Sequence, residues 1–392
     1  MGIFLGNKRL QEIYLGDKIV KEAYFNNQRI YPSFKVMTAV IDLSDSNPAT
    51  CVSYADDAVN MVAGSSAWDE FFGHYPCILK NGIELGKLNP SDFAQYENGG
   101  SAPITTLGND VMIAFPRLGV RITTENNKIT VSMTNELNNP DFKYYAHSRG
   151  DVAKDVFYLG AYKGYTPDGR LYSVSGKLAE VGGTIKYFRL CAHNRGSGYE
   201  QSGFYQVLFR QCMYILKYKN LNSQDTIGKG YTGGSAKHNT GITNTKGMDY
   251  GSITSATEPV KLFGLEDFWG NIWEFVDGIV IDANRNILTA TDNFNDSGSG
   301  YTNQGQGATS NIEGYIKAPQ GTTETGFLIK TNGGSETTYF CDNAYLVASS
   351  IAALGGSFVD GSKSGVFNFS MGNSAVTTYN PYFGSRLMYL PA

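Results

Sequence analysis

The hydrophobic and polar positions of the first 32 residues repeat every ten residues. Ile3–Glu12 aligns with Ile13–Glu22, and both align more loosely with Ala23–Pro32. Each unit has an apolar triplet, then a Gly-Asn, Gly-Asp or Asn-Asn pair, then a mixed stretch. Because such pairs accept positive φ, each unit is predicted to form a hairpin. Units this short cannot bury a core alone, so they need further copies of the chain or a larger assembly, unless they form a simple meander on the next domain.

Residues 34–139 have a mixed pattern in which short alternating stretches predominate. This pattern is typical of half-buried strands. Strands are predicted at Val36–Asp42, Asp110–Phe115, Val120–Thr124 and Lys128–Met133, and short helices at Ala55–Val62 and Ala67–Phe72.

The pattern changes again after residue 140. Phe157–Tyr162 is predicted to be a strand, and apolar residues at helical spacing predict the strongest helix of the chain over Ser202–Lys219. Residues 220–260 and 285–340 are polar and rich in small residues, so both are predicted to be long loops. Long loops in a compact domain are usually functional or structurally special.

The most distinctive stretch is Leu262–Gly278, which holds two of the three tryptophans. Ile272, Glu274 and Val276 alternate with Trp273, Phe275 and Asp277, so we predict a strand with one aromatic face, entered through a tight turn at Gly270-Asn271. The residues alone favour a core strand, because large aromatic side chains dominate protein cores.

Composition and charge exclude some function classes. The net charge is −4 and charged residues are 17% of the chain, which argues against a nucleic-acid-binding protein. No apolar run approaches the roughly 18 residues that span a membrane, and the N-terminus turns polar too early for a signal peptide. The five cysteines are scattered, which predicts reduced, buried thiols and synthesis in a reducing cytoplasm.

No catalytic, metal or cofactor motif has its required context. Gly228–Gly233 matches G-x-G-x-x-G but lacks a preceding strand and a following apolar helix, so no nucleotide site is predicted. The four histidines form no cluster with cysteines, so no zinc site is expected. Glu266 and Asp267 would point to opposite faces of a strand, so at least one is predicted to be a buried structural partner. A catalytic triad assembled from distant residues stays open.

The last fifty residues are poor in charge. Aromatic residues stand there among Ser, Asn, Thr and Gly. Tyrosine offers a large contact area at low entropic cost, and small polar residues offer adaptable hydrogen bonds, as in antibody binding surfaces. The composition also fits an ordinary glycine-rich β-region.

Several motifs resemble one family. Gly264–Asp277 resembles the "G-N-V-W-E-W" signature of the formylglycine-generating-enzyme-like branch of the C-type lectin fold. Leu354–Phe358, Gly365–Phe367 and Gly384–Leu387 resemble that branch's closing "R-G-G-S-W … G-F-R" elements. With its Tyr-, Asn- and Ser-rich end, the chain resembles the variable proteins of diversity-generating retroelements, in which a reverse transcriptase rewrites adenines near the 3′ end of the gene.

The resemblance covers residues 140–392. It implies an α+β fold in which a C-type lectin fold of the formylglycine-generating-enzyme-like branch follows β-rich N-terminal modules. The predicted domains are a prism-like β-repeat for assembly or attachment (1–33), a β-rich intermediate domain (34–139) and a ligand-binding lectin-fold domain (140–392) whose variable region is about 355–385. The repeat, Asp110–Pro116 and Phe142–His147 resemble modules of phage and prophage tail proteins.

The function that the resemblance implies is that of a non-enzymatic adhesin of a phage or prophage tail tip, made in the bacterial cytoplasm. Its partners would be a bacterial cell-surface protein or glycan, virion tail proteins and further copies of the chain, with a trimer favoured. Neither a cofactor nor a metal is implied, nor nucleic-acid binding or membrane insertion. The alternatives are a structural tail or baseplate module without a ligand, and an enzyme of the formylglycine-generating type.

Two departures from the family matter. The enzymes carry a reactive cysteine pair near the C-terminus, whereas the last cysteine here is Cys341, so their activity is not carried over. The family's "R-G-G" arginine is Leu354 here, and its "G-F-R" is Gly384-Ser385-Arg386.

The resemblance also implies which residues bind and which support the site. Ten side chains between the scaffold elements are expected to point outward and bind the ligand: Phe358, Asp360, Ser362, Asn368, Ser370, Asn373, Tyr379, Asn380, Tyr382 and Phe383. Of these, Tyr379, Tyr382 and Phe383 are the expected hot spots. Structural support is expected from Trp269, Trp273, Gly355, Gly356, Gly384 and Arg386.

Overall fold

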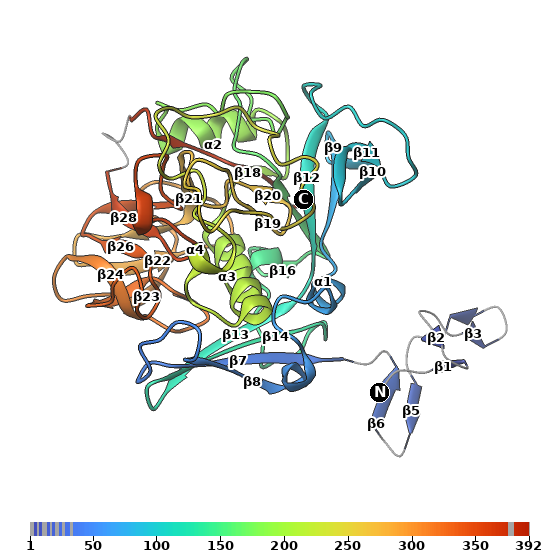
Figure 1. Ribbon diagram of the computed structural model, residues 1–392, viewed down its shortest axis with the longest axis horizontal. Coiled ribbons are helices and arrows are strands. Elements are labelled where there is room, and N and C mark those ends of the chain that lie inside the picture. Colours follow the sequence, from blue (N-terminus) through green and yellow to red (C-terminus); the bar gives the residue numbers. More distant parts are fainter. Residues whose placement is uncertain are drawn as a thin grey trace.

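The chain is mostly β, with few helices, in the computed structural model (Figure 1). The structure describes residues 34–374 and 380–391, together with six short strands in the first 33 residues.

Those six strands form three antiparallel hairpins, one in each ten-residue repeat unit. They are β1 (Phe4–Leu5) with β2 (Lys8–Arg9), β3 (Tyr14–Leu15) with β4 (Lys18–Ile19), and β5 (Ala23–Phe25) with β6 (Gln28–Tyr31). The predicted hairpins are therefore present. That they form an assembly module stays a prediction.

A four-stranded antiparallel sheet follows, in the order β13-β14-β7-β8. Its strands are β7 (Val36–Asp42), β8 (Val52–Asp56), β13 (Gly119–Glu125) and β14 (Lys128–Thr134). Asn126 and Asn127 both have positive φ, which suits a two-residue hairpin turn between β13 and β14. The predicted helices here are η1 (Asp57–Asn60), shorter than expected, and α1 (Ala67–Phe72).

A seven-stranded sheet contains strands from both sides of residue 139, where a domain boundary is predicted. Its order is β11-β10-β9-β12-β17-β30-β18. The strands are β9 (Tyr75–Lys80), β10 (Ile83–Asn89), β11 (Asp92–Tyr96), β12 (Asp110–Pro116), β17 (Val156–Gly160), β18 (Tyr199–Gln201) and β30 (Leu387–Tyr389). The C-terminal strand β30 therefore lies between β17 and β18.

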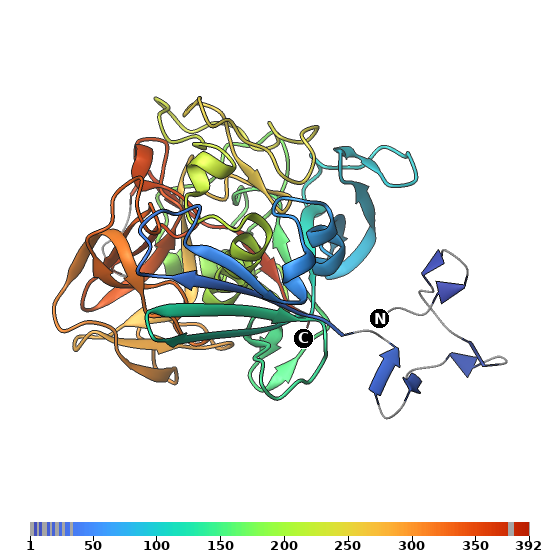
Figure 2. The same ribbon diagram turned by 60° about the horizontal axis from the view of Figure 1, so that its bottom comes forward.

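A nine-stranded sheet carries the C-terminal segments. Its order is β23-β22-β21-β27-β28-β26-β24-β25, and β29 pairs with β21. The strands are β21 (Trp273–Ile281), β22 (Asn286–Thr289), β23 (Thr302–Gln306), β24 (Ile312–Pro319), β25 (Ile329–Asn332), β26 (Asn343–Leu346), β27 (Ser350–Leu354), β28 (Phe369–Asn373) and β29 (Phe383–Gly384). Figure 2 shows these strands as a curved layer on one side of the molecule.

The prediction of a loop over 285–340 is wrong, because β22, β23, β24 and β25 lie in it. β23 illustrates the reason: it has the sequence TNQGQ and none of its residues is buried. A strand without a buried face has no alternation of apolar residues, so the sequence pattern does not reveal it.

The helices lie among the sheets. The predicted helix is present as α3 (Phe204–Tyr218), which is buried along nearly its whole length and lies at the centre of the molecule (Figure 1). The others are α2 (Ile185–His193), α4 (Ser223–Thr226), η2 (Tyr145–His147) and η3 (Gly361–Lys363). Two small hairpins are β15 (Ser148–Arg149) with β16 (Val152–Ala153), and β19 (Lys261–Leu262) with β20 (Leu265–Glu266). Among the described helices, none has the length and apolar character that crossing a membrane requires.

Candidate ligand-binding face

Two C-terminal segments meet at the turn that opens β21. The N–H of Phe358 donates to the carbonyl of Asn271 at 3.0 Å, and the N–H of Trp273 donates to the carbonyl of Tyr382 at 2.8 Å. The rings of Phe358 and Tyr382 therefore come within 5.4 Å of each other, at an angle of 55°. We call the surface formed by residues 357–363, 372–374 and 380–382 the C-terminal face.

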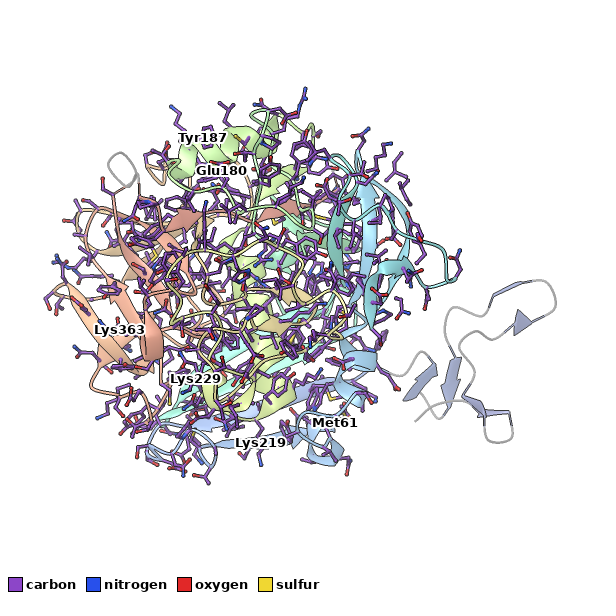
Figure 3. All side chains as sticks on the ribbon, turned by 45° about the horizontal axis from the view of Figure 1, so that its top comes forward. Met61, Glu180, Tyr187, Lys219, Lys229 and Lys363 are labelled. Atoms are coloured by element: carbon purple, nitrogen blue, oxygen red, sulfur yellow. The ribbon has the colours of Figure 1, made fainter. Side chains whose placement is uncertain are left out.

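Six of the ten predicted contact residues have side chains that are not buried. Ser362 is exposed, and Phe358, Asp360, Asn373, Asn380 and Tyr382 are half-buried. Ser362 is followed by Lys363, which Figure 3 labels on the side of the molecule that carries the C-terminal strands. Its hydroxyl is 3.2 Å from the hydroxyl of Tyr315, a residue of β24 that the sequence did not indicate.

The expectation of an outward side chain is wrong for Asn368, Ser370 and Phe383, which are all buried. The amide nitrogen of Asn368 donates to two backbone carbonyls within the fold. Phe383 stacks on Trp273, with ring centres 5.8 Å apart and planes 9° apart. Ser370 stands in β28 between Phe369 and Met371, which are also buried, and Phe383 is followed in β29 by buried Gly384. Both faces of the sheet are therefore covered at these positions, so no side chain there can point to solvent. Tyr379 lies outside the described residues.

Two of the predicted contact residues use their polar atoms to shape the loops. The carboxylate of Asp360 accepts from the N–H of Ser357 at 2.6 Å and from its hydroxyl at 2.7 Å. The side-chain oxygen of Asn380 accepts from the N–H of Tyr382 at 2.9 Å. Short-range bonds of this kind fix turns, so these two residues hold the face in shape.

The predicted glycine positions leave no room for a side chain. Gly355 has a φ of +92°, and a Cβ there would lie 2.8 Å from the carbonyl oxygen of Phe268. A Cβ at Gly384 would collide with the carbonyl oxygen of Glu180, and one at Gly356 with the hydroxyl of Ser364. The backbone beneath the face is therefore closely packed.

A buried cluster of charges lies beneath the face. Oε2 of Glu274 is 2.7 Å from Nε of Arg386 and 3.1 Å from Nζ of Lys163, and its Oε1 is 3.7 Å from Arg210. Burial would raise the pKa of Glu274, but the three cations hold it well below its usual range. Burial lowers the pKa of Lys163 to about 8 and that of Arg210 to about 10.

The guanidinium of Arg386 also donates to the carbonyls of Gly160 and Glu266, each at 2.8 Å. Arg386 thereby ties the C-terminal end of the chain to β17, β20 and β21. Beside this cluster, Trp269 is completely buried.

Glu266 and Asp267 are both buried and serve different partners, as a structural role requires. Glu266 accepts from the N–H of Gly241 at 2.6 Å and from the N–H of Thr243 at 2.7 Å. Asp267 accepts from the side-chain amide of Asn271 at 2.8 Å and lies 3.2 Å from Nε2 of His238. Burial opposes the charged form of His238, but the charge of Asp267 outweighs it and raises the pKa of His238 to about 9.

The loop that carries His238 also supports the face. The N–H of Gly234 donates to the carbonyl of Phe358 at 2.9 Å, and the N–H of Gly361 donates to the carbonyl of Thr232 at 3.0 Å. This neighbouring loop is not predictable from residue types, because the contacts run through backbone atoms that every residue type carries.

The described residues of the face contain aromatic rings, hydroxyls, amides, the carboxylate of Asp360 and the amine of Lys363, but no thiol. All five cysteines are buried, and burial raises the pKa of each thiol, that of Cys51 to about 12. Within the described part of the chain, no group of three or more His, Cys, Asp or Glu side chains could hold a metal ion.

Comparison with known proteins gave matches among solved structures only. No family model and no curated protein matches the chain. It is similar to the Major Tropism Determinant I1 variant (12% identity, 84% of this chain and 73% of that chain, TM-score 0.32) and to the U1 variant (13%, 84%, 73% and 0.32). The M1 variant follows with 13% identity, 84% and 72% coverage and a TM-score of 0.30. All three of these solved structures are variants of the Major Tropism Determinant.

Proposed function

We propose that this chain is a non-enzymatic receptor-binding adhesin that displays diversified side chains on a lectin-like scaffold, at the tail tip of a phage or prophage. Its target would be a protein or glycan of the bacterial cell surface. The finer fold assignment, the formylglycine-generating-enzyme-like branch of the C-type lectin fold, belongs to the same proposal. It is supported by the turn at Gly270-Asn271 and by the ion pair between Glu274 and Arg386.

The observation that carries the proposal is the pairing of Phe358 with Tyr382. These two half-buried rings come from different segments, and each segment is hydrogen-bonded to the same turn. Paired aromatic side chains on a fixed backbone lose little entropy on binding and often dominate interface energies. The buried charge cluster and the close-packed glycines keep that backbone in place while the outward side chains vary.

A non-enzymatic role is supported by the state of the thiols. Formylglycine-generating chemistry needs a reactive thiolate, whereas burial raises the pKa of every cysteine of this chain. The three N-terminal hairpins are the proposed contact with virion tail proteins and with the other subunits of a homo-oligomer, for which we favour a trimer. Size-exclusion chromatography with light scattering on the full chain measures that state directly.

Binding of the labelled full-length chain to a panel of bacterial strains tests the adhesin role. Tyr382→Ala and Phe358→Ala should each weaken binding by about thirtyfold if they act as hot spots. Ile83→Ala and Leu85→Ala are matched controls, because both side chains are exposed on the distant strand β10. If the two face variants and the two control variants affect binding equally, or if the chain binds no strain, the structural-module alternative is favoured. The burial of Phe383 also agrees with that alternative.

Deep sequencing of the 3′ end of the gene across a natural population tests the diversification. Substitutions should concentrate at the codons for Phe358, Asn373 and Tyr382, and an adenine-bearing near-copy of the stretch should lie nearby. A 3′ end no more variable than the rest of the gene would contradict the proposal of a diversified face.

A further inference from the structure

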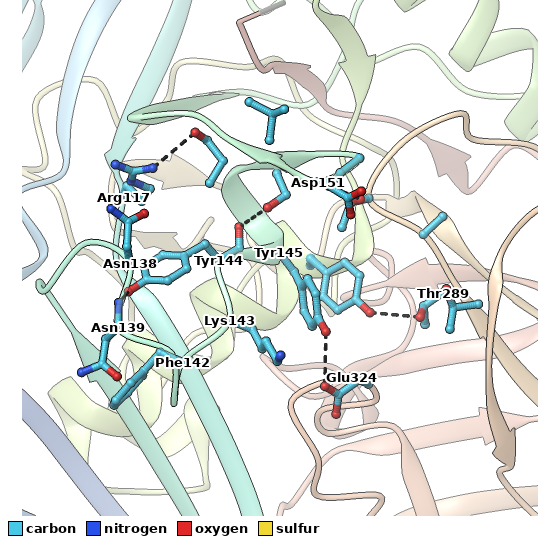
Figure 4. A pocket seen from close by; sticks show the side chains of 18 of the residues that line it. Arg117, Asn138, Asn139, Phe142, Lys143, Tyr144, Tyr145, Asp151, Thr289 and Glu324 are labelled. Atoms are coloured by element: carbon cyan, nitrogen blue, oxygen red, sulfur yellow. Dashed lines mark hydrogen bonds between the residues drawn. The ribbon is translucent and has the colours of Figure 1, made fainter.

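A cavity of about 760 Å³ lies away from the C-terminal face. It opens between the segment around η2 with the β15–β16 hairpin on one side and strands β22 and β23 on the other (Figure 4). None of its lining residues falls within 355–384. Its volume lies in the range of about 300–1,000 Å³ that is usual for ligand sites.

Two tyrosine rings stand side by side in this cavity. The ring centres of Tyr145 and Tyr205 are 4.6 Å apart. The hydroxyl of Tyr205 donates to the hydroxyl of Thr289 at 3.0 Å, and that of Tyr145 donates to Glu324 at 3.4 Å, as the dashed lines in Figure 4 show. Tyr205 is only 6% exposed and supports the half-buried ring of Tyr145, which offers apolar surface next to hydrogen-bonding groups.

The wall that carries Tyr145 is held in place by internal hydrogen bonds. The hydroxyl of Tyr144 accepts from the N–H of Asn139 at 3.0 Å and donates to the carbonyl of Glu136 at 2.5 Å. The side-chain amide of Gln206 donates to the carbonyl of Ala146 at 2.5 Å. A wall fixed in this way reduces the entropic cost of binding.

The charges that line the cavity balance. Arg117 and Lys143 face Asp151 and Glu324 across it. Arg117 is already 3.1 Å from Asp155, yet its buried Nε has no hydrogen-bond partner. Balanced charges give an ionic ligand no net attraction, whereas a neutral ligand rich in hydroxyls can bond to both carboxylates and cations.

We propose that this cavity is a second binding site, for a neutral oligosaccharide, that works independently of the C-terminal face. The sugar's apolar face would pack on Tyr145, and its hydroxyls would bond to Glu324, Arg117 and the side chain of Gln304. A neutral oligosaccharide matches the lining better than an ionic ligand does, because the two cations and two carboxylates among the lining residues cancel and an aromatic ring stands beside them.

Saturation-transfer difference NMR on the full chain tests the proposal. The probes are the neutral trisaccharides maltotriose, N,N′,N″-triacetylchitotriose and raffinose, each at about 5 mM, a concentration suited to millimolar affinity. At least one should receive saturation. Glu324→Gln should weaken its binding by about fivefold or more, and Tyr145→Phe should weaken it less, since it keeps the ring. Tyr145→Ala should abolish it.

Ile83→Ala is the control, because its exposed side chain on β10 belongs neither to the cavity nor to the C-terminal face, so sugar binding should stay unchanged. Circular dichroism and thermal unfolding measure whether each variant folds. If Tyr145→Ala fails to fold, Glu324→Gln still tests the proposal. The proposal is overturned if no trisaccharide receives saturation, or if Glu324→Gln and Tyr145→Phe both leave binding unaltered. Binding of an uncharged serine- and asparagine-rich hexapeptide in place of the sugars, lost in Tyr145→Ala, would identify a peptide site and overturn the sugar assignment.

Discussion

Nε of Arg386 lies 2.7 Å from Oε2 of Glu274, and both side chains are completely buried. The pair joins the C-terminal end of the chain to β21. The turn that opens this strand is hydrogen-bonded to the backbone of Phe358 and of Tyr382. We therefore expect the ion pair to help hold the C-terminal face in shape.

Removing one partner of this pair should be costly. Arg386→Met keeps much of the side-chain volume but removes the hydrogen bonds to the carbonyls of Gly160 and Glu266. It also removes one of the three cations that balance the buried negative charge of Glu274. We expect a loss of about 3–5 kcal/mol in the free energy of unfolding, measured by urea denaturation. Lys128→Ala removes an exposed ion pair with Asp42 and should leave the free energy of unfolding nearly unchanged. Equal losses in the two variants would contradict the role given to the buried pair.

His238 should make stability depend on pH. Its pKa is raised from 6.5 to about 9, so its contribution is fully present below pH 6.5 and is lost as the pH rises toward 9. Lys163 and Lys261 have lowered pKa values, of about 8 and 7, and act in the opposite direction. The informative quantity is therefore the difference between the wild type and His238→Gln.

That difference should be on the order of 2–3 kcal/mol at pH 6 and should shrink toward zero above pH 9, as followed by urea denaturation across this range. If the difference in the free energy of unfolding between the wild type and His238→Gln is independent of pH, Asp267 does not stabilise the protonated form of His238.

Gly355 and Gly361 provide a matched pair of glycines. Both have positive φ, but a Cβ at Gly355 would lie 2.8 Å from a carbonyl oxygen, whereas none of the described atoms lies within 4 Å of one at Gly361. Gly361→Ala should cost about 1 kcal/mol, the price of the backbone conformation alone. Gly355→Ala should cost clearly more, about 2–4 kcal/mol. The measurement is the shift in the midpoint of chemical denaturation, and equal shifts would speak against close packing beneath the face.

Phe383 and Tyr382 are neighbours with different roles. Phe383 is buried against Trp273 and Phe275, so Phe383→Ala should destabilise the protein by about 3 kcal/mol or more. Tyr382 is half-buried, so Tyr382→Ala should cost much less stability while weakening binding to cells. Chemical denaturation and cell binding, measured on both variants, show which residue stabilises the fold and which one contacts the ligand. The reverse order of stabilities would mean that Tyr382 belongs to the scaffold.

The thiols should be unreactive in the folded protein. Burial raises the pKa of all five cysteines, so little thiolate is present at pH 7. Ellman's reagent should react slowly with the native chain and rapidly with five thiols in denaturant. A cysteine that reacts fast in the native protein would reopen the enzymatic alternative.

Local structure with a strong apolar period was predictable from the sequence. The helix α3, the strand β21 with its Gly270-Asn271 turn, and the hairpins of the decapeptide repeat follow from spacing and turn residues alone. The motif around Trp273 also pointed to the region that carries the face. In each case neighbouring residues decide the conformation, because the period and the turn are properties of a short stretch.

The tertiary structure decided what local pattern could not. Four strands, β22 to β25, form within the polar stretch 285–340, and β30 lies between β17 and β18. Asn368 and Phe383, whose side chains were expected to point outward, are buried. The tertiary structure also brought Phe358 next to Tyr382, and Arg386 next to Glu274. The pairing and register of distant strands decide which side chains face the core. A short stretch of sequence does not determine that pairing.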